Sequence, residues 1–529
     1  MEPNTAAVPP GPAGQAAEER TQLSKTLKPS WVWAIALGSA VGWGAFVLPT
    51  DWLGTAGPLG AVLGFVIGGA LMVVIAVSYG LLIRSFPVSG GEFAYALAGF
   101  GRRHAFLCSW FLTLGYVCIV ALNASALALL SRYVIPEVAE RGLLYQIAGW
   151  DVYLGEVLIA TASLVLFAWL NVRGATTSGR LQFIFCLVMI AGVLAILVGV
   201  LLHPDVVLSN LSPALPTDVP ALTAVLGIVA IAPWAYVGFD NVPQAAEEFD
   251  FSPAKAFRLI VFAIVVAALI YVAMIIATAA ATPWTQLVES APIWGTGDAV
   301  SGLFGGVGIM LLALSVAMGI CTGLNGFYVS ASRLMFAMGR AQMVPSAFAR
   351  VHPRHRTPHV AIVFTCALCL VAPWFGREAL LWVVDMSAIG VTIAYAYTCF
   401  VAFKLFRWSG ASQTGGDLDG AASTARKLLS LLGGVVALGF LALLLVPGSP
   451  AALGRESAIA LLVWVVLGVV FYLARRARNR KLSDDELAYL VLGTRPEDGS
   501  LGAAAAAVQS GATSAPDDEA RDGTASSGV

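Results

Sequence analysis

Charged residues are scarce in this chain of 529 residues. Asp, Glu, Lys and Arg together make up 12%, whereas soluble domains carry about 25%. Hydrophobic residues make up 58%, and the mean hydropathy is +0.83. This composition excludes an ordinary soluble domain and predicts an all-α polytopic membrane protein in contact with a lipid bilayer. The formal net charge of −1 gives no indication of a nucleic-acid partner, and none is predicted.

Sequence patterns of catalysis are absent as well. The chain contains no phosphate-binding G-x-x-x-x-G-K-[ST] loop, no G-x-S-x-G elbow and no H-E-x-x-H pair. Its five histidines fall in predicted loops or at span ends, and its seven cysteines lie almost all in apolar runs, where they are expected to be small buried residues. We therefore predict that the protein is not an enzyme and has no catalytic residue, cofactor or metal site.

Long hydrophobic runs are the main feature that is present. A membrane-spanning helix needs about 20 apolar residues, and on this criterion the sequence predicts twelve spans. They lie at about 31–53, 58–83, 92–131, 151–171, 180–202, 219–246, 256–281, 302–331, 359–375, 379–406, 428–446 and 456–474. The last two belong to segment 407–480. Segments 1–30 and 481–529 are polar or of low complexity and are predicted to be disordered tails.

The distribution of Lys and Arg predicts the orientation. With the N-terminus inside, nearly all of these residues near the span ends fall on the cytoplasmic side. The exceptions are Arg132, Arg141, Arg377 and Arg455. Moving one span boundary would destroy this bias, so it supports twelve spans and two cytoplasmic termini. We expect the protein to lie in the cell membrane.

Two of the predicted spans contain residues that a lipid-facing helix should avoid. The first, 31–53, contains G-S-A-V-G-W-G at 38–44. The sixth, 219–246, contains Pro233, Gly238, Asp240 and Pro243. Backbone polar groups in the hydrocarbon region must be satisfied within the protein, so each interruption indicates that something other than lipid lies beside it.

The positions of the interruptions indicate an internal repeat. They lie five spans apart, so a unit of five helices that occurs twice would run in opposite senses across the membrane. Such inverted repeats with paired broken helices hold the substrate of many secondary transporters. We predict a ten-helix core over 31–406, with halves 31–202 and 219–406.

The backbone of the two breaks predicts the chemistry of a site. Amides freed near Gly42 and Gly44 suit a carboxylate, and carbonyls at 228–230, left free by Pro233, suit an ammonium group. Together they match an α-amino acid zwitterion. The alternative is helix packing, because Gly and Pro are common in membrane helices and G-x-x-x-G at 38–42 is a packing motif. Two breaks at matching positions favour a site.

Several side chains are open to two interpretations. Trp43 and Trp234 either offer cation–π contacts or pack in the core. Asp240, inside a span, is either a proton carrier or part of a structural ion pair, and Asp385 is either a second coupling group or a local hydrogen-bonding group. Arg180 either replaces a coupling cation or anchors the cytoplasmic end of its span.

Five motifs resemble those of one known family. They are G-W-G-A-F-V-L-P at Gly42–Pro49, F-P-V-S-G-G-E-F-A-Y at Phe86–Tyr95, the run Asn171–Gln182, the run Trp234–Glu248 and S-A-S-R-L-M-F-A-M-G-R at Ser330–Arg340. In this order, over residues 30–410, they are similar to the amino acid–polyamine–organocation (APC) transporters. The resemblance implies a LeuT-type fold of twelve helices, with a 5+5 inverted-repeat core, broken first and sixth helices and two additional helices.

The resemblance also implies roles for residues. The substrate carboxylate would meet the amides of Gly42, Trp43 and Gly44. The amino end would meet the backbone near Ala40, Trp234 and Val237. Asp240 falls where some members carry an acidic residue linked to pH response, and Arg180 falls near a basic residue that replaces a sodium ion in some proton-coupled members.

One residue departs from the family pattern. Trp43 stands where the family commonly has a small residue. Either the indole reduces the pocket, or it points away and only its backbone amide serves the substrate.

The sequence thus predicts a secondary active transporter that moves amino acids by alternating access, with proton-coupled symport. The alternative is a carrier of polyamine- or ethanolamine-like organocations, or an amino acid exchanger. The oligomeric state is left open.

Overall fold

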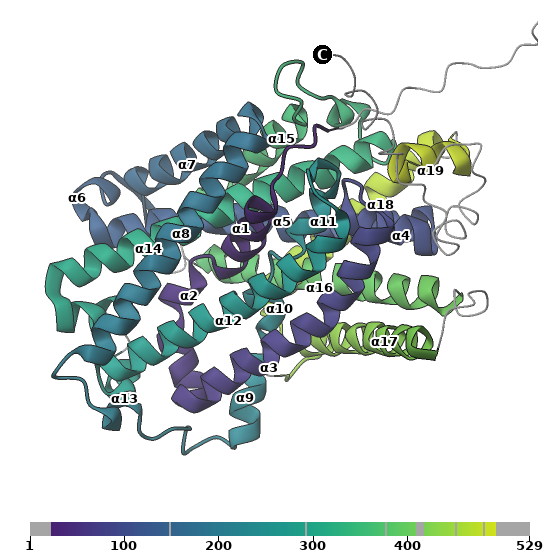
Figure 1. Cartoon of the computed structure of the whole chain (residues 1–529). Helices are drawn as coiled ribbons and strands as arrows, with labels where there is room; N and C mark the ends of the chain where they lie inside the picture. The colour runs from purple at the N-terminus through teal and green to yellow at the C-terminus, as the bar shows by residue number, and fades with distance from the viewer. Residues whose placement is uncertain are drawn as a thin grey trace, which may run out of the picture.

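The computed structural model describes residues 23–147, 150–290, 292, 294–375, 378–408, 417–449, 452–479 and 482–493. Within these ranges the chain is mostly helical, and Figure 1 shows the helices packed side by side in one bundle. The one sheet of the described residues is an antiparallel hairpin of β1 (Leu143–Ile147) and β2 (Trp150–Tyr153). The architecture is that of a polytopic membrane protein.

Nine helices of the described residues are long and apolar enough to cross a membrane. They are α3 (Pro49–Ser85), α5 (Arg102–Val134), α7 (Leu154–Arg173), α8 (Ala175–Leu202), α12 (Ala256–Ala281), α14 (Gly295–Arg340), α16 (Glu378–Trp408), α17 (Asp417–Leu445) and α18 (Arg455–Asn479). Three shorter apolar helices are α1 (Pro29–Val41), α9 (Ala221–Ala230) and α15 (His359–Cys369). Each of the twelve predicted spans overlaps one of these helices; that all twelve cross the bilayer stays a prediction.

The remaining helices are short. They are α2 (Gly44–Val47), α4 (Gly91–Phe100), α6 (Pro136–Ala139), α10 (Ala232–Ala235), α11 (Asn241–Gln244), α13 (Trp284–Glu289) and α19 (Asp484–Leu492). The predicted span 92–131 is in fact two helices, α4 and α5, because Gly101 between them has φ 82° and ψ −174°, outside the helical region.

The two predicted disordered tails are partly ordered. Leu23 and Leu27 are buried, and the backbone of Leu27 forms a bridge with Phe249. Near the other end, Ser483 caps α19, which buries Leu487 and packs against α4. The prediction of disorder is therefore wrong for 23–30 and 484–492, where buried leucines pack against the bundle. Residues 1–22 and 494–529 lie outside the described residues.

Four buried charged residues, which we term the ionic cluster, join the segments at one end of the bundle. Arg333 donates from Nε to Glu248 Oε1 over 2.7 Å, and Arg340 Nη2 lies 3.0 Å from Glu247 Oε2. Glu247 also accepts the backbone amides of Leu23 and Ser89. The ionic cluster therefore holds α14, the segment after α11, the N-terminal segment and the chain before α4 in one place.

Breaking the ionic cluster should destabilise the protein strongly. Arg333 and Glu248 are 1% and 3% exposed, so Arg333→Gln leaves a buried carboxylate without its cation, at a cost of about 3–5 kcal/mol in the free energy of unfolding. The measurement is the melting temperature in detergent. The control is Asp484→Asn, which breaks a pair with Arg102 whose side chains are 68% and 21% exposed and should cost less than about 1 kcal/mol. Equal shifts for both variants would contradict this assignment.

Candidate functional site

The first break interrupts the chain between α1 and α2. Helix α1 ends at Val41 because Gly42 takes φ 50° and ψ −153°, and helical structure resumes at Gly44. Among the described residues, the amides of Trp43, Gly44 and Ala45 form no backbone hydrogen bond of normal geometry, although residues 42–43 form a turn. These amides lie at the start of α2, where N–H groups lack intrahelical partners and favour negative charge. A non-helical turn at Gly42 and Trp43 thus precedes α2, and its use for a carboxylate stays a prediction.

The second break is displaced from its predicted place. The amide of Ile231 folds back onto the carbonyls of Ile228 and Val229, so these two carbonyls are not free as predicted. The non-helical segment follows α10 and includes Gly238, at φ 136°. Pro233 removes its own N–H, but the tight turn at Ile231 uses two of the three carbonyls that were predicted to be free. Among the described residues no backbone partner is found for the third, that of Ala230.

The two breaks are in direct contact. A Cβ atom on Gly238 would lie 2.5 Å from the backbone nitrogen of Ala40, so only glycine fits there. Tyr271 of α12 lies across both breaks, with its hydroxyl 2.9 Å from the carbonyl oxygen of Ala40 and 2.7 Å from that of Ala235. Helix α12 thereby fixes the separation of the two broken segments.

Two indoles cover the contact between the breaks. Trp43 and Trp234 meet edge to face, with ring centroids 6.3 Å apart and an interplanar angle of 70°. The Trp234 ring lies over Gly44, where a Cβ atom would come within 2.5 Å of Cη2. Val237 is buried beside them. The glycine at 44 is thus required by the position of Trp234.

Trp43 faces a small cavity. The cavity has a volume of about 40 Å³, which is room for a few water molecules. Its lining is Trp43, Val47, Ala126, Leu129, Leu130, Tyr133, Trp294 and Val316. The indole nitrogen of Trp43 has no hydrogen-bond partner among the described residues. The indole of Trp43 therefore lines a small cavity next to the first break, and that it reduces a substrate pocket stays a prediction.

Asp240 is fully buried next to the second break. Its Oδ1 accepts the amide of Gly238 over 2.7 Å, and its Oδ2 accepts the hydroxyl of Tyr116 over 2.9 Å. The hydroxyl of Tyr395 lies 3.5 Å from Oδ1. No ion pair of Asp240 with a basic residue occurs in the described ranges, so the alternative of a structural pair with Arg finds no support.

A second buried acid, which the sequence reasoning missed, is connected to Asp240. Glu92 of α4 accepts the hydroxyl of Tyr79 over 2.8 Å and the amide group of Gln244. The same Gln244 nitrogen lies 3.5 Å from the Tyr116 hydroxyl, which donates to Asp240. Hydrogen bonds thus run from Glu92 to Asp240 through two side chains.

Burial of Glu92 is the property that the sequence did not reveal. Burial first, and the negative charge of Asp240 second, raise the pKa of Glu92 well above its usual range. Glu92 stands in the first turn of α4, where an acidic residue is ordinary because of the helix dipole. Its place in the motif Phe86–Tyr95 was the one signal that could have singled it out.

Arg180 does not lie with the other predicted site residues. It is exposed near the start of α8, whereas Gln182, two residues later, is buried and donates to the carbonyls of Ala34 and Thr322. A polar but uncharged side chain therefore links α8 to α1 and α14. This position favours the interpretation of Arg180 as an anchor.

Asp385 lies away from Asp240, although the next turn of α16, at Ala388 and Ile389, belongs to a cluster against which Trp234 packs. It accepts the hydroxyl of Ser457 of α18 over 2.6 Å. It precedes Tyr395, the α16 residue that approaches Asp240, by ten positions, which is about 15 Å along a helix. The structure therefore favours local hydrogen bonding for Asp385.

Comparison with known families identifies the class of protein to which this site belongs. A family model described as "Amino acid permease" matches residues 28–471. The chain belongs to the amino acid permease family. The match includes both broken segments, Asp240 and the ionic cluster, and it agrees with the APC resemblance of the sequence motifs. The permease is accordingly a multi-pass membrane transporter rather than an enzyme.

Individual relatives of the permease have low sequence identity to it but match most of its length. An uncharacterized transporter of Rhizobium meliloti is 27% identical over 72% of this chain and 79% of its own. A branched-chain amino acid permease of Bacillus subtilis is 26% identical over 85% of this chain and 92% of its own. The human large neutral amino acids transporter small subunit 2 is 29% identical, over 64% and 62% respectively.

The contact between Gly44 and Trp234 can be tested by substitution. Gly44→Ala should displace the Trp234 ring and lower the free energy of unfolding by about 1–3 kcal/mol, the usual cost of overpacking, seen as a lower melting temperature. Gly302→Ala is the matched control, because a Cβ atom there meets open space. In the double variant Gly44→Ala/Trp234→Ala the clash is absent, so its loss of stability should be smaller than the sum of the two single losses; a loss equal to that sum would contradict the contact.

Proposed function

We propose that this permease carries neutral amino acids across the cell membrane by proton-coupled symport with alternating access. The observation that carries the proposal is the contact between the two breaks beside an uncharged, aromatic cavity. Unpartnered amides are offered by one break and non-helical backbone by the other, as a zwitterion requires. The relatives named for branched-chain and large neutral amino acids support the same substrate class.

The proposal includes the architecture that the sequence predicted. The nine long helices and the three short ones would form twelve spans with both termini in the cytoplasm. The halves 31–202 and 219–406 would form a LeuT-type inverted-repeat core, to which 407–480 adds the last two spans. The occurrence of the broken helices α1 and α9 at corresponding places of the two halves supports this arrangement.

The substrate would lie across both breaks. Its carboxylate would accept from the amides of Gly42, Trp43 and Gly44, and its ammonium group would meet the backbone near Ala40, Trp234 and Val237. The Ala40 carbonyl accepts from Tyr271 but keeps a second lone pair for the ammonium group.

The substrate side chain would enter the cavity beside Trp43. No charged residue is found among the described residues that line this cavity, so a charged side chain would lose its hydration without gaining a partner. The small volume favours a short or branched aliphatic side chain.

Asp240 is the group that we propose to carry the coupled proton. It is buried without a cation, and its neutral form would lose little, because a protonated carboxyl still accepts hydrogen bonds and gains a donor. Glu92, joined to it through Gln244 and Tyr116, would extend the path toward the end of the bundle that holds α4. Arg180 and Asp385 have no part in this path.

Uptake into proteoliposomes tests the function directly. With an inward proton gradient, labelled leucine or valine should accumulate and lysine should not. Accumulation should vanish when a protonophore removes the gradient. Uptake of putrescine or ethanolamine without leucine would support the organocation alternative, and leucine uptake that requires internal amino acid but no gradient would support an exchanger.

The role of Asp240 predicts a specific change in pH dependence. Asp240→Asn keeps the side-chain volume but carries no titratable proton, so gradient-driven accumulation should fall by tenfold or more while exchange of internal for external leucine continues. Asp385→Asn is the matched control, an intramembrane acid outside the path, and should retain accumulation. If Asp240→Asn accumulates leucine with unaltered pH dependence, Asp240 is not the coupling group.

A further inference from the structure

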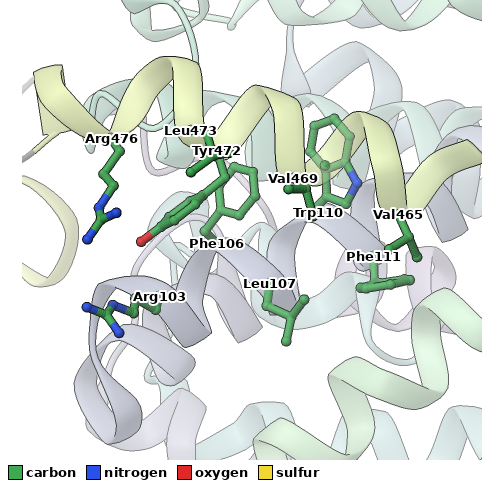
Figure 2. Close-up of a pocket in the computed structure, with 11 residues that line it drawn as sticks. Arg103, Phe106, Leu107, Trp110, Phe111, Val465, Val469, Tyr472, Leu473 and Arg476 are labelled. Carbon is green, nitrogen blue, oxygen red and sulfur yellow. The ribbon is translucent and has the colours of Figure 1, made fainter.

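A groove separate from the candidate site runs between α5 and α18. Its volume is about 380 Å³, within the range of small-molecule sites. Figure 2 shows Phe106, Trp110, Val469 and Tyr472 along it, from both helices. The lining is apolar over most of its length, so it suits a hydrocarbon chain.

Two arginines stand together at one end of the groove. Arg103 of α5 and Arg476 of α18 lie at the same end, and the hydroxyl of Tyr472 is directed toward that end (Figure 2). Within the part of the chain that the structure describes, no carboxylate is paired with Arg103 or Arg476. The neighbouring Arg102, by contrast, is bonded to Asp484.

The groove faces the surroundings of the bundle at membrane depth. Both α5 and α18 are apolar enough to span a membrane. Of the most apolar stretch of α18 only 11% is buried, against 78% for α16. A helix so little covered by its own protein lies against lipid, and the two arginines come where its apolar stretch ends. Arginines at such a boundary attract anionic headgroups.

We infer that the groove between α5 and α18 binds an anionic phospholipid. One acyl chain lies along Phe106, Trp110 and Val469, and the phosphate accepts hydrogen bonds from Arg103 and Arg476. Guanidinium groups pair with phosphate through two parallel hydrogen bonds, and Tyr472 adds a donor. This inference depends on the membrane location of the permease and not on its substrate or its coupling ion.

A second copy of the chain fits the groove less well. In a dimer with a two-fold axis along the membrane normal, the same surface of each copy meets the other at the same depth. Arg103 and Arg476 of one copy would then approach their equivalents, and like charges would repel. An anionic lipid satisfies both the apolar groove and its charged end.

Native mass spectrometry of the full chain tests this inference. The permease is delipidated in detergent and titrated with dioleoyl-phosphatidylglycerol or, separately, dioleoyl-phosphatidylcholine. We expect selective retention of phosphatidylglycerol and an apparent affinity about 30-fold weaker for the double variant Arg103→Gln/Arg476→Gln, since two arginines at roughly 1 kcal/mol each contribute roughly 2 kcal/mol. The control Arg84→Gln/Arg258→Gln removes two exposed arginines outside the groove and should leave the affinity unchanged.

Three results would overturn the inference. They are equal retention of both lipids, unchanged phosphatidylglycerol affinity in Arg103→Gln/Arg476→Gln, and a dimer whose α18 faces cross-link while lipid is excluded. If the arginine variant is misfolded by circular dichroism, Leu107→Trp replaces it. That change fills the groove without touching either arginine, and retention of phosphatidylglycerol at wild-type affinity there also overturns the inference.

Discussion

The requirement that every backbone polar group in the hydrocarbon region finds a partner governs this structure. Intact helices such as α5 and α12 meet it internally. At the two breaks it is met by neighbours: Tyr271 takes the carbonyls of Ala40 and Ala235, and Asp240 takes the amide of Gly238. A ligand that accepts hydrogen bonds from the unpartnered amides near Trp43 would therefore gain more binding free energy there than at groups that already have a partner. The same need of backbone groups for hydrogen-bond partners therefore shapes both the packing around the breaks and the proposed binding site.

The sequence was informative where a local pattern determines the outcome. Glycine and proline marked both broken segments, and hydrophobic length located helices at all twelve predicted spans. It failed where the outcome depends on contacts distant in sequence. The amide of Ile231 consumes carbonyls that Pro233 alone would have freed, and Gln182, not Arg180, faces α1. A residue's type and span do not tell which side of its helix is covered.

The buried acids show the same limit. Asp240 stood out because an acid inside a span is rare, yet Glu92, equally buried, looked like an ordinary residue of a helix start. Its burial arises from α3, α5 and the segment after Asp240, which contribute Tyr79, Tyr116 and Gln244. The ordered segment at 23–28 was missed for a related reason: its partners are more than 200 residues away.

The ionic cluster has a consequence for the population of partly opened forms. The N-terminal segment, the chain before α4 and α14 all depend on the carboxylates of Glu247 and Glu248. Releasing one of these elements alone would leave a carboxylate of the ionic cluster buried without all of its partners. That state has a higher free energy than the state in which the whole cluster stays buried or the state in which it is fully exposed to water. This end of the bundle should therefore open as one cooperative event, with few half-open molecules at equilibrium.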